Sequence, residues 1–103
     1  MRSIPLQATA NQAISITVDR NRWDITIKAA VDSMVIDLRL SDQVIVRGLR
    51  IIPNQPIIPY RYLATVGNFM LLTVDNALPD WRRFDVDQEL VYATAEEIAS
   101  YGD

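Results

Sequence analysis

Cysteine and histidine are both absent from this sequence of 103 residues, and Lys28 is the only lysine among its ten basic residues. Without cysteine the chain can form no disulfide, no thiolate nucleophile and no structural zinc site of the usual kind. Without histidine it lacks the commonest general base and transition-metal ligand, and with them the Ser/His and Cys/His arrangements of nucleophilic catalysis. The sequence has no phosphate-binding glycine motif and no nucleophile elbow, and no spacing of acidic residues selects a catalytic pair. We therefore expect a protein that is not an enzyme.

Glutamate is almost as scarce as lysine, since Glu89, Glu96 and Glu97 are the only glutamates among thirteen acidic residues. Lysine and glutamate are depleted where proteins meet, whereas arginine is enriched at such contacts because its planar group makes paired hydrogen bonds and stacks on rings. The composition is typical of a subunit in an assembly. A G+C-rich genome, which favours arginine and alanine codons, explains it equally well.

No apolar run is long enough to cross a bilayer, and residues 1–12 (MRSIPLQATANQ) contain no hydrophobic signal-peptide core. We expect neither a membrane segment nor a signal peptide, and by default a cytoplasmic location. The length is that of one domain, and a composition of 50% apolar and 22% charged residues is that of a folded chain.

Most of the chain shows the two-residue hydrophobic period of strands that bury one face of a sheet. Residues 13–19 (AISITVD) and 23–29 (WDITIKA) alternate in this way, and the turn residues between them predict a hairpin. Residues 33–40 (SMVIDLRL) and 43–52 (QVIVRGLRII) predict a second hairpin, with a bulge or bend at Gly48. Further predictions are a turn at 53–56, an edge strand at 57–66, a turn at 66–68, a strand buried on both faces at 69–75 and a last strand at 89–93.

These short strands at roughly ten-residue spacing predict an all-β fold, a small antiparallel β-barrel or sandwich of about six to eight strands. We expect one β domain over residues 1–93 and a short C-terminal helical tail over residues 94–103. In the tail, Thr94 and Glu97 form a capping box and Gly102 can end the helix. Two helical turns are marginal alone, so Ile98 and Tyr101 need a surface to pack on and are candidate partner contacts.

Two segments suggest ligands. Asp85, Asp87 and Glu89 would share one face of an extended strand and could offer oxygen ligands to a hard cation, although calcium loops also need a glycine and more ligands. A solvated strand face accounts for them better. Residues 60–62 (YRY) resemble the aromatic and basic surface of small barrels that bind single-stranded nucleic acid. The chain has a net charge of −3 and scattered basic residues, so nucleic-acid binding is kept only as the alternative function.

Residues 75–87 (DNALPDWRRFDVD) place Trp81, two arginines and Phe84 among acidic residues, and Pro79 limits regular structure there. Tryptophan and arginine are frequent binding anchors, because each provides a large desolvated contact. In the other interpretation, Trp81 and Phe84 fold back onto the end of the barrel while the arginines pair with Asp80 and Asp85. On the local sequence alone the second interpretation is somewhat favoured. The candidate partner contacts in this segment are Asp80, Trp81, Arg82, Arg83 and Phe84.

A collinear series of short stretches runs through residues 4–92: IPLQATANQAISITVD (4–19), RW (22–23), MVIDLRL (34–40), VRG (46–48), VGN (66–68), LPDW (78–81) and LVY (90–92). In this order they resemble the small plug proteins of phage baseplates, the family typified by the plug of a minimal contractile-tailed cyanophage. Pro79, Asp80 and Trp81 correspond to a "dP-x-W"-like segment of that family, although here proline precedes aspartate.

The resemblance implies a structural virion protein at the central axis of the tail tip, associated with the hub, the spike and the end of the tail tube. It implies no catalysis and no cofactor. It also implies several copies in a symmetric assembly, with no membrane partner. The protein is expected in the tail baseplate of the virion, after assembly in the host cytoplasm. We hypothesise that Trp81, Arg82 and Arg83 anchor the domain in a neighbouring baseplate subunit.

Overall fold

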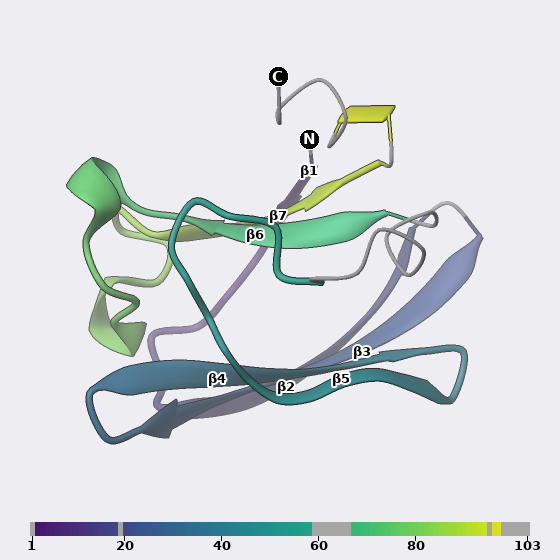
Figure 1. Cartoon of the computed structure of the whole chain (residues 1–103), viewed down its shortest axis with the longest axis horizontal. Coiled ribbons are helices and arrows are strands. Elements are labelled where there is room, and N and C mark those ends of the chain that lie inside the picture. Colours follow the sequence, from purple (N-terminus) through teal and green to yellow (C-terminus); the bar gives the residue numbers. More distant parts are fainter. Residues whose placement is uncertain (1, 19, 59–66, 95, 98–103) are drawn as a thin grey trace.

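Two antiparallel sheets face each other in the computed structural model, which describes residues 2–18, 20–58, 67–94 and 96–97 (Figure 1). One sheet has the strand order β2-β3-β4-β5 and the other has the order β1-β7-β6. The strands are β1 (Arg2–Ile4), β2 (Asn11–Val18), β3 (Asn21–Ala30), β4 (Ser33–Leu40), β5 (Gln43–Arg50), β6 (Asn68–Leu72) and β7 (Glu89–Ala93). The predicted all-β class, with short strands in antiparallel sheets, is confirmed.

The four-stranded sheet is a meander whose strands are joined by two-residue loops. The pairs that flank these loops are Val18–Asn21, Ala30–Ser33 and Leu40–Gln43. Ser41 and Asp42 both have positive φ, 48° and 70°, which is the type I′ geometry that suits the twist of a hairpin. Both predicted hairpins are confirmed, and a turn through Asp32 (φ 60°) joins them.

A bulge interrupts β5 at the predicted glycine. Ile36 pairs with Leu49 and Leu38 with Val46, so two residues of β5 stand opposite Asp37. One of them is Gly48, which has a φ of 62° and whose N–H donates to Oδ1 of Asp37 at 2.5 Å. The prediction of a bulge is therefore confirmed, and the carboxylate satisfies the backbone group that leaves the ladder.

The three-stranded sheet is built around β7, which has the bounds predicted for the last strand. Strand β6 is buried on both faces as predicted, but the expected strand ends at Leu72 instead of residue 75. The strand cannot continue to residue 75 because Asp75 adopts a left-handed φ of 55°, and the short 3-10 turn η2 (Val74–Asn76) takes its place. Strand β1 was not predicted. It has only three residues, too few for an alternation, and it is held by pairing with β7.

The outer edge of β6 is covered by the segment after β5. The N–H groups of Asn54 and Ile57 donate to Leu71 and Phe69 carbonyl oxygens at 2.8 Å each. The predicted turn at 53–56 is confirmed. The expected edge strand at 57–66 lies outside the described residues except for Ile57 and Ile58, which are not in a strand, and the expected turn at 66–68 lies partly outside them.

Three buried aromatic rings join the two sheets. Trp23 from β3 meets Phe69 from β6 edge-to-face, with ring centroids 5.0 Å apart and planes at 84°. Phe69 in turn meets Tyr92 from β7 at 5.3 Å and 63°. Such edge-to-face pairs stabilise by about 0.5–1.5 kcal/mol beyond the area they bury. The cluster therefore helps to hold the two sheets together.

The predicted helical tail lies largely outside the described residues, and so do Ile98 and Tyr101. Its capping box is present: the Thr94 N–H donates to Oε1 of Glu97 at 3.0 Å, and the Glu97 N–H donates to Oγ1 of Thr94 at 3.2 Å. The domain boundary after residue 93 stays a prediction. No helix among the described ranges is long and apolar enough to span a membrane.

Candidate partner-contact site

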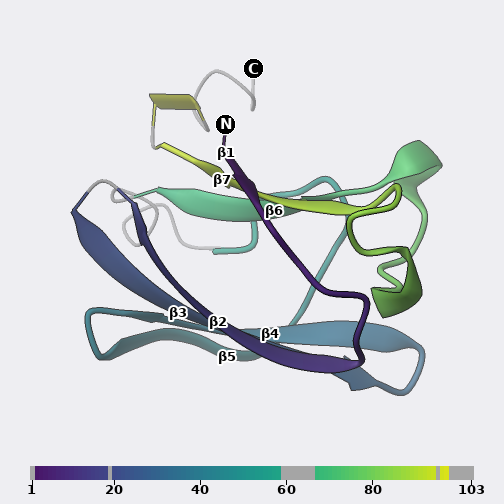
Figure 2. The same ribbon diagram turned by 180° about the vertical axis from the view of Figure 1, so that it is seen from behind.

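The segment between β6 and β7 forms one end of the sandwich, drawn in green in Figures 1 and 2. It contains η2, an irregular stretch at 77–80, the 3-10 turn η3 (Trp81–Arg83) and a tight turn at 85–87. Proline at position 79 and left-handed backbone at Asp75, Asn76 and Asp85 keep the segment out of the ladder. The chain thereby presents side chains at the end of the sandwich instead of extending a strand.

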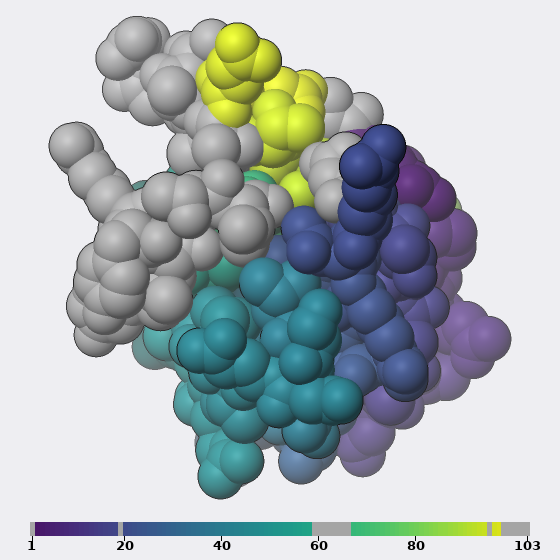
Figure 3. Space-filling view, turned by 90° about the vertical axis from the view of Figure 1, so that its right-hand side faces the viewer, coloured from purple at the N-terminus to yellow at the C-terminus, as the bar shows by residue number. Residues whose placement is uncertain are grey.

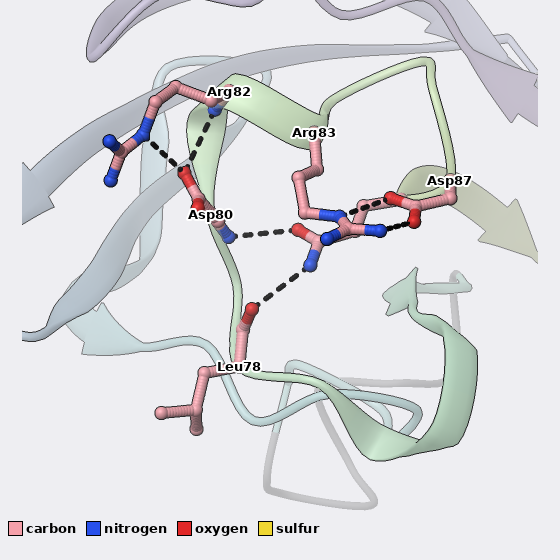
Figure 4. Close-up of polar contacts among 6 residues, drawn as sticks. Leu78, Asp80, Arg82, Arg83 and Asp87 are labelled. Carbon is pink, nitrogen blue, oxygen red and sulfur yellow. Dashed lines mark hydrogen bonds and ion pairs between the residues drawn. The ribbon is translucent and has the colours of Figure 1, made fainter.

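Asp80 begins η3 as its N-cap residue. Its Oδ1 accepts the backbone N–H of Arg82 at 3.0 Å and the Nε–H of the same residue at 3.2 Å (Figure 4). The bond from the Arg82 backbone N–H, followed by its side-chain bond and positive charge, lowers the pKa of the Asp80 carboxyl. Asp80 is therefore a carboxylate near neutral pH that fixes the start of the turn.

Arg83 lies on the other side of η3 and is bound within the segment. Its Nε donates to Oδ1 of Asp87 at 2.7 Å and its Nη2 donates to Oδ2 of the same carboxylate (Figure 4). The expected pairing of the arginines with Asp80 and Asp85 therefore holds for Arg82 and is wrong for Arg83. Asp85 turns the other way, because its φ is 60° and its Oδ2 accepts the N–H of Leu6 at 3.0 Å.

Gln88 ties the two ends of the segment together, and sequence reasoning did not find it. Its side chain is buried, its Oε1 accepts the Asp80 N–H at 2.8 Å, and its Nε2 donates to the Leu78 carbonyl oxygen at 2.9 Å. A single glutamine in a polar stretch carries no sequence signal of burial. Its role appears only once residues 78–80 are folded back over it.

The aromatic residues of the segment divide between core and surface. Phe84 is 2% exposed and belongs to the core, whereas Trp81 is half-buried and packs against the edge of that core. The guanidinium carbon of Arg82 lies 5.5 Å from the centre of the Trp81 ring. Arg82 and Arg83 keep 72% and 54% of their side chains exposed. Of the predicted contact residues, the end of the sandwich thus presents Asp80, Trp81, Arg82 and Arg83.

Exposed apolar side chains surround this group. Leu78 is 63% exposed, Val86 is 78% exposed and Val74 is 57% exposed. Val31 is 90% exposed and belongs to the turn between β3 and β4. Figures 1 and 2 show this turn toward the same end of the molecule as the green segment. Val74 and Val86 also line an open groove of about 520 Å³ beside Pro5 and Thr73. Isolated apolar residues in turns gave no clear sequence signal, but their exposed side chains offer apolar surface to a protein partner.

A family model described as "Cyanophage baseplate Pam3 plug gp18" matches residues 1–96 of the 103. The chain belongs to this family of baseplate plugs. The resemblance drawn from the short stretches is thereby confirmed. Comparison with curated proteins gave no match.

Membership makes the chain a structural component of the phage tail baseplate that associates with other baseplate proteins. A baseplate plug is not normally an enzyme. The matched residues include the whole end segment and β7, and they stop before Ile98 and Tyr101. Nothing in the match supports nucleic-acid binding, and residues 60–62, on which that alternative rested, lie outside the described part.

The acidic series at the start of β7 is not the extended face considered from the sequence. Asp85 sits in a turn, and the carboxylates of Asp85 and Asp87 are engaged by Leu6 and Arg83. Within the described ranges, no three acidic side chains converge in a way that could hold a metal ion.

Proposed function

We propose that the chain is a plug subunit at the central axis of the baseplate, where it contacts the hub, the spike and the end of the tail tube. It acts through protein–protein contacts. Several copies are arranged symmetrically about the axis, with three-fold or six-fold symmetry, after assembly in the host cytoplasm. Family membership supports the baseplate setting, and the exposed apolar and arginine side chains at one end of the sandwich support the mode of contact.

The contact end consists of Val74, Leu78, Trp81, Arg82 and Val86. An apolar patch with one aromatic and one arginine side chain has the composition of an interface core, in which a few such residues carry most of the binding energy. In the described residues, only Nε of the Arg82 guanidinium is hydrogen-bonded. Its terminal nitrogens are thus available for a paired contact with a carboxylate of the partner.

Arg83 has a different role in this proposal. Its guanidinium already makes a two-bond contact with Asp87, so it serves mainly to hold the segment in shape. The bonds of Gln88 and Asp80 do the same at the other side of η3. A contact end that is rigid before binding loses less conformational entropy on docking.

The proposal is tested by co-expressing the chain with the hub, spike and tube proteins of the same phage and measuring which of them co-purify. Trp81→Ala should weaken capture by about 2 kcal/mol or more, on the order of thirtyfold in affinity. Arg82→Ala should weaken it as well. Val44→Ala, which alters an exposed apolar residue of β5, is the matched control and should leave capture unchanged.

Unfolding of the isolated variants separates docking from packing. If Trp81→Ala lowers the stability of the free chain but leaves affinity per folded molecule unchanged, then Trp81 only covers the core and the contact end is wrongly placed. Capture of none of the axial baseplate proteins would overturn the axial location itself.

A further inference from the structure

Strand β2 is an outer strand of the four-stranded sheet, and nothing in its sequence protects its free edge. It runs from Asn11 to Val18 in unbroken register with β3. It contains no charged residue, no proline and no bulge, the features that normally prevent an edge from pairing with another chain. Figure 3 shows the N-terminal part of the chain, in purple, along one flank, away from the teal segment that contains β5.

The other three outer strands are blocked. Strand β5 has two register shifts and carries Arg47 and Arg50. The edge of β6 is hydrogen-bonded by Asn54 and Ile57. Strand β1 has only three residues. The contrast singles out β2 as a regular edge of eight residues that is open to pairing.

One hydrogen bond shows which backbone groups of β2 point away from the sheet. The Ala29 N–H donates to the Ala10 carbonyl oxygen at 2.9 Å, so Ala10 directs its backbone toward β3. Along an antiparallel ladder every second residue does the same. Ala13, Ser15 and Thr17 therefore direct their N–H and C=O groups away from the sheet, and in the described part of the chain no group bonds to them there.

We propose that β2 pairs antiparallel with β2 of a second copy of the chain, about a two-fold axis at Ser15. The run Ala13–Thr17 (AISIT) reads almost the same in both directions. In this register Ser15 exchanges both backbone bonds with Ser15 of the other copy, and Ala13 pairs with Thr17. Ile14 stands beside Ile16 of the other copy, and both are half-buried residues that pack against the core and would lose their remaining exposed surface.

Self-pairing is favoured over another strand because in this register Ser15 and the two isoleucines stand opposite residues of their own kind, and β2 contains no charged residue that would repel its copy. The same four-stranded sheet simply continues into the second copy. A two-fold pair is a closed unit, so the inference concerns the chain before it enters an axial assembly, and it does not rest on the proposed function.

Charged substitutions at Ser15 test the pairing of β2 with its copy in the full chain. Ser15→Lys and Ser15→Glu each place like charges directly opposite one another, so each should raise the dimer dissociation constant on the order of tenfold or more in sedimentation velocity. An equimolar mixture of the two should form dimers again. Val44→Lys adds the same charge to the opposite edge of the sheet and should leave dimerisation unchanged, as should Ser15→Ala.

Amide hydrogen exchange gives a second readout. With rising concentration of the unaltered chain, exchange should slow at Ala13, Ser15 and Thr17, whereas Ile14 and Ile16 should be unaffected because their N–H groups already bond to β3. Fluorescence of buried Trp23 shows whether the charged variants are folded, which matters because Glu at position 15 would face Asp24. A chain that stays monomeric at all concentrations, or dimers that survive both charged substitutions, would overturn the proposal. Protection of the same three amides only on addition of a baseplate protein would assign the edge to that protein instead.

Discussion

The side-chain amide of Gln88 bridges two points of the backbone, because it accepts the Asp80 N–H and donates to the Leu78 carbonyl oxygen. Gln88 is 1% exposed, and it precedes the first residue of β7. The side chain thus connects the irregular contact end to the regular sheet. The shape of the contact end therefore depends in part on this one side chain.

Replacing Gln88 with leucine should destabilise the fold. Two backbone groups lose their buried partner, and each such loss costs about 1–3 kcal/mol. Because both bonds are only partly buried, we expect the lower part of the summed range, a fall of about 2–4 kcal/mol in the free energy of unfolding in urea. Gln43→Leu, at the exposed start of β5, is the control and should change stability by less than about 0.5 kcal/mol. Equal effects of the two substitutions would show that the bridge is not important for stability.

Asp80→Ala removes the cap of η3 and should cost about 0.5–2 kcal/mol at pH 7. The pKa of Asp80 is lowered in the folded chain, chiefly by the backbone bond from Arg82. A lowered pKa stabilises the folded state above the unfolded pKa, near 3.8, and this contribution is lost as pH falls through the folded value. The stability difference between the unaltered chain and the variant, measured by urea unfolding, should therefore shrink below about pH 4. A difference that is constant from pH 7 to pH 2 would contradict this assignment.

The pKa of Asp24 is also lowered, first by the hydrogen bond that it accepts from the Ser15 hydroxyl at 2.6 Å and then by the charges of Arg22 and Arg39. Ser15→Ala removes the first of these causes. An NMR titration of the side-chain carboxyl carbon should then show the pKa of Asp24 moving up toward its ordinary value of 3.8. The pKa of Asp80 serves as an internal control and should not move.

Two glycines with positive φ should respond differently to alanine. At Gly48 (φ 62°) an added Cβ meets nothing within 4 Å, so only backbone strain is expected, about 1–2 kcal/mol. At Gly67 (φ 114°) an added Cβ would overlap the ring and hydroxyl of buried Tyr92. Gly67→Ala should therefore cost about 3 kcal/mol or more, since strain and overpacking act together. Thermal unfolding of the two variants measures both losses of stability. An equal loss of stability in the two variants would mean that Tyr92 moves aside at little cost.

Much of the sheet architecture could be predicted because the alternation of apolar and polar residues along a strand is a local property of the sequence. The hairpins of β2 to β5, the bulge at Gly48 and the bounds of β7 all follow from side-chain period and turn chemistry within a few residues. Strand β1 could not be predicted, because it depends on a contact with a distant part of the chain. Its three residues form a strand only because β7, nearly ninety residues later, offers an edge to pair with (Arg2 with Tyr92).

The residue types of the segment between β6 and β7 identified it as a candidate contact site, but the positions of its side chains could not be predicted from them. The sequence drew attention to Trp81 and the two arginines, and it left open whether they faced a partner or the core. The structure sends Phe84 inward, leaves Trp81 half-buried and pairs Arg83 with Asp87. Leu78 and Val86 could be assigned to the site only from the structure, because the residues next to them in the sequence do not indicate that their side chains are exposed.

By itself the sequence determined that the chain is an all-β member of the baseplate plug family without the usual catalytic groups, since composition, period and collinear motifs are properties of the chain alone. Only the tertiary structure decided which side chains of the irregular end are presented. The backbone there follows no repeating hydrogen-bond pattern, so its course is set by contacts between distant residues, such as the bond from the Leu6 N–H to Asp85 across 79 positions. The open edge of β2 is likewise a property of the assembled sheets, because a strand becomes an outer strand only when its neighbours are in place.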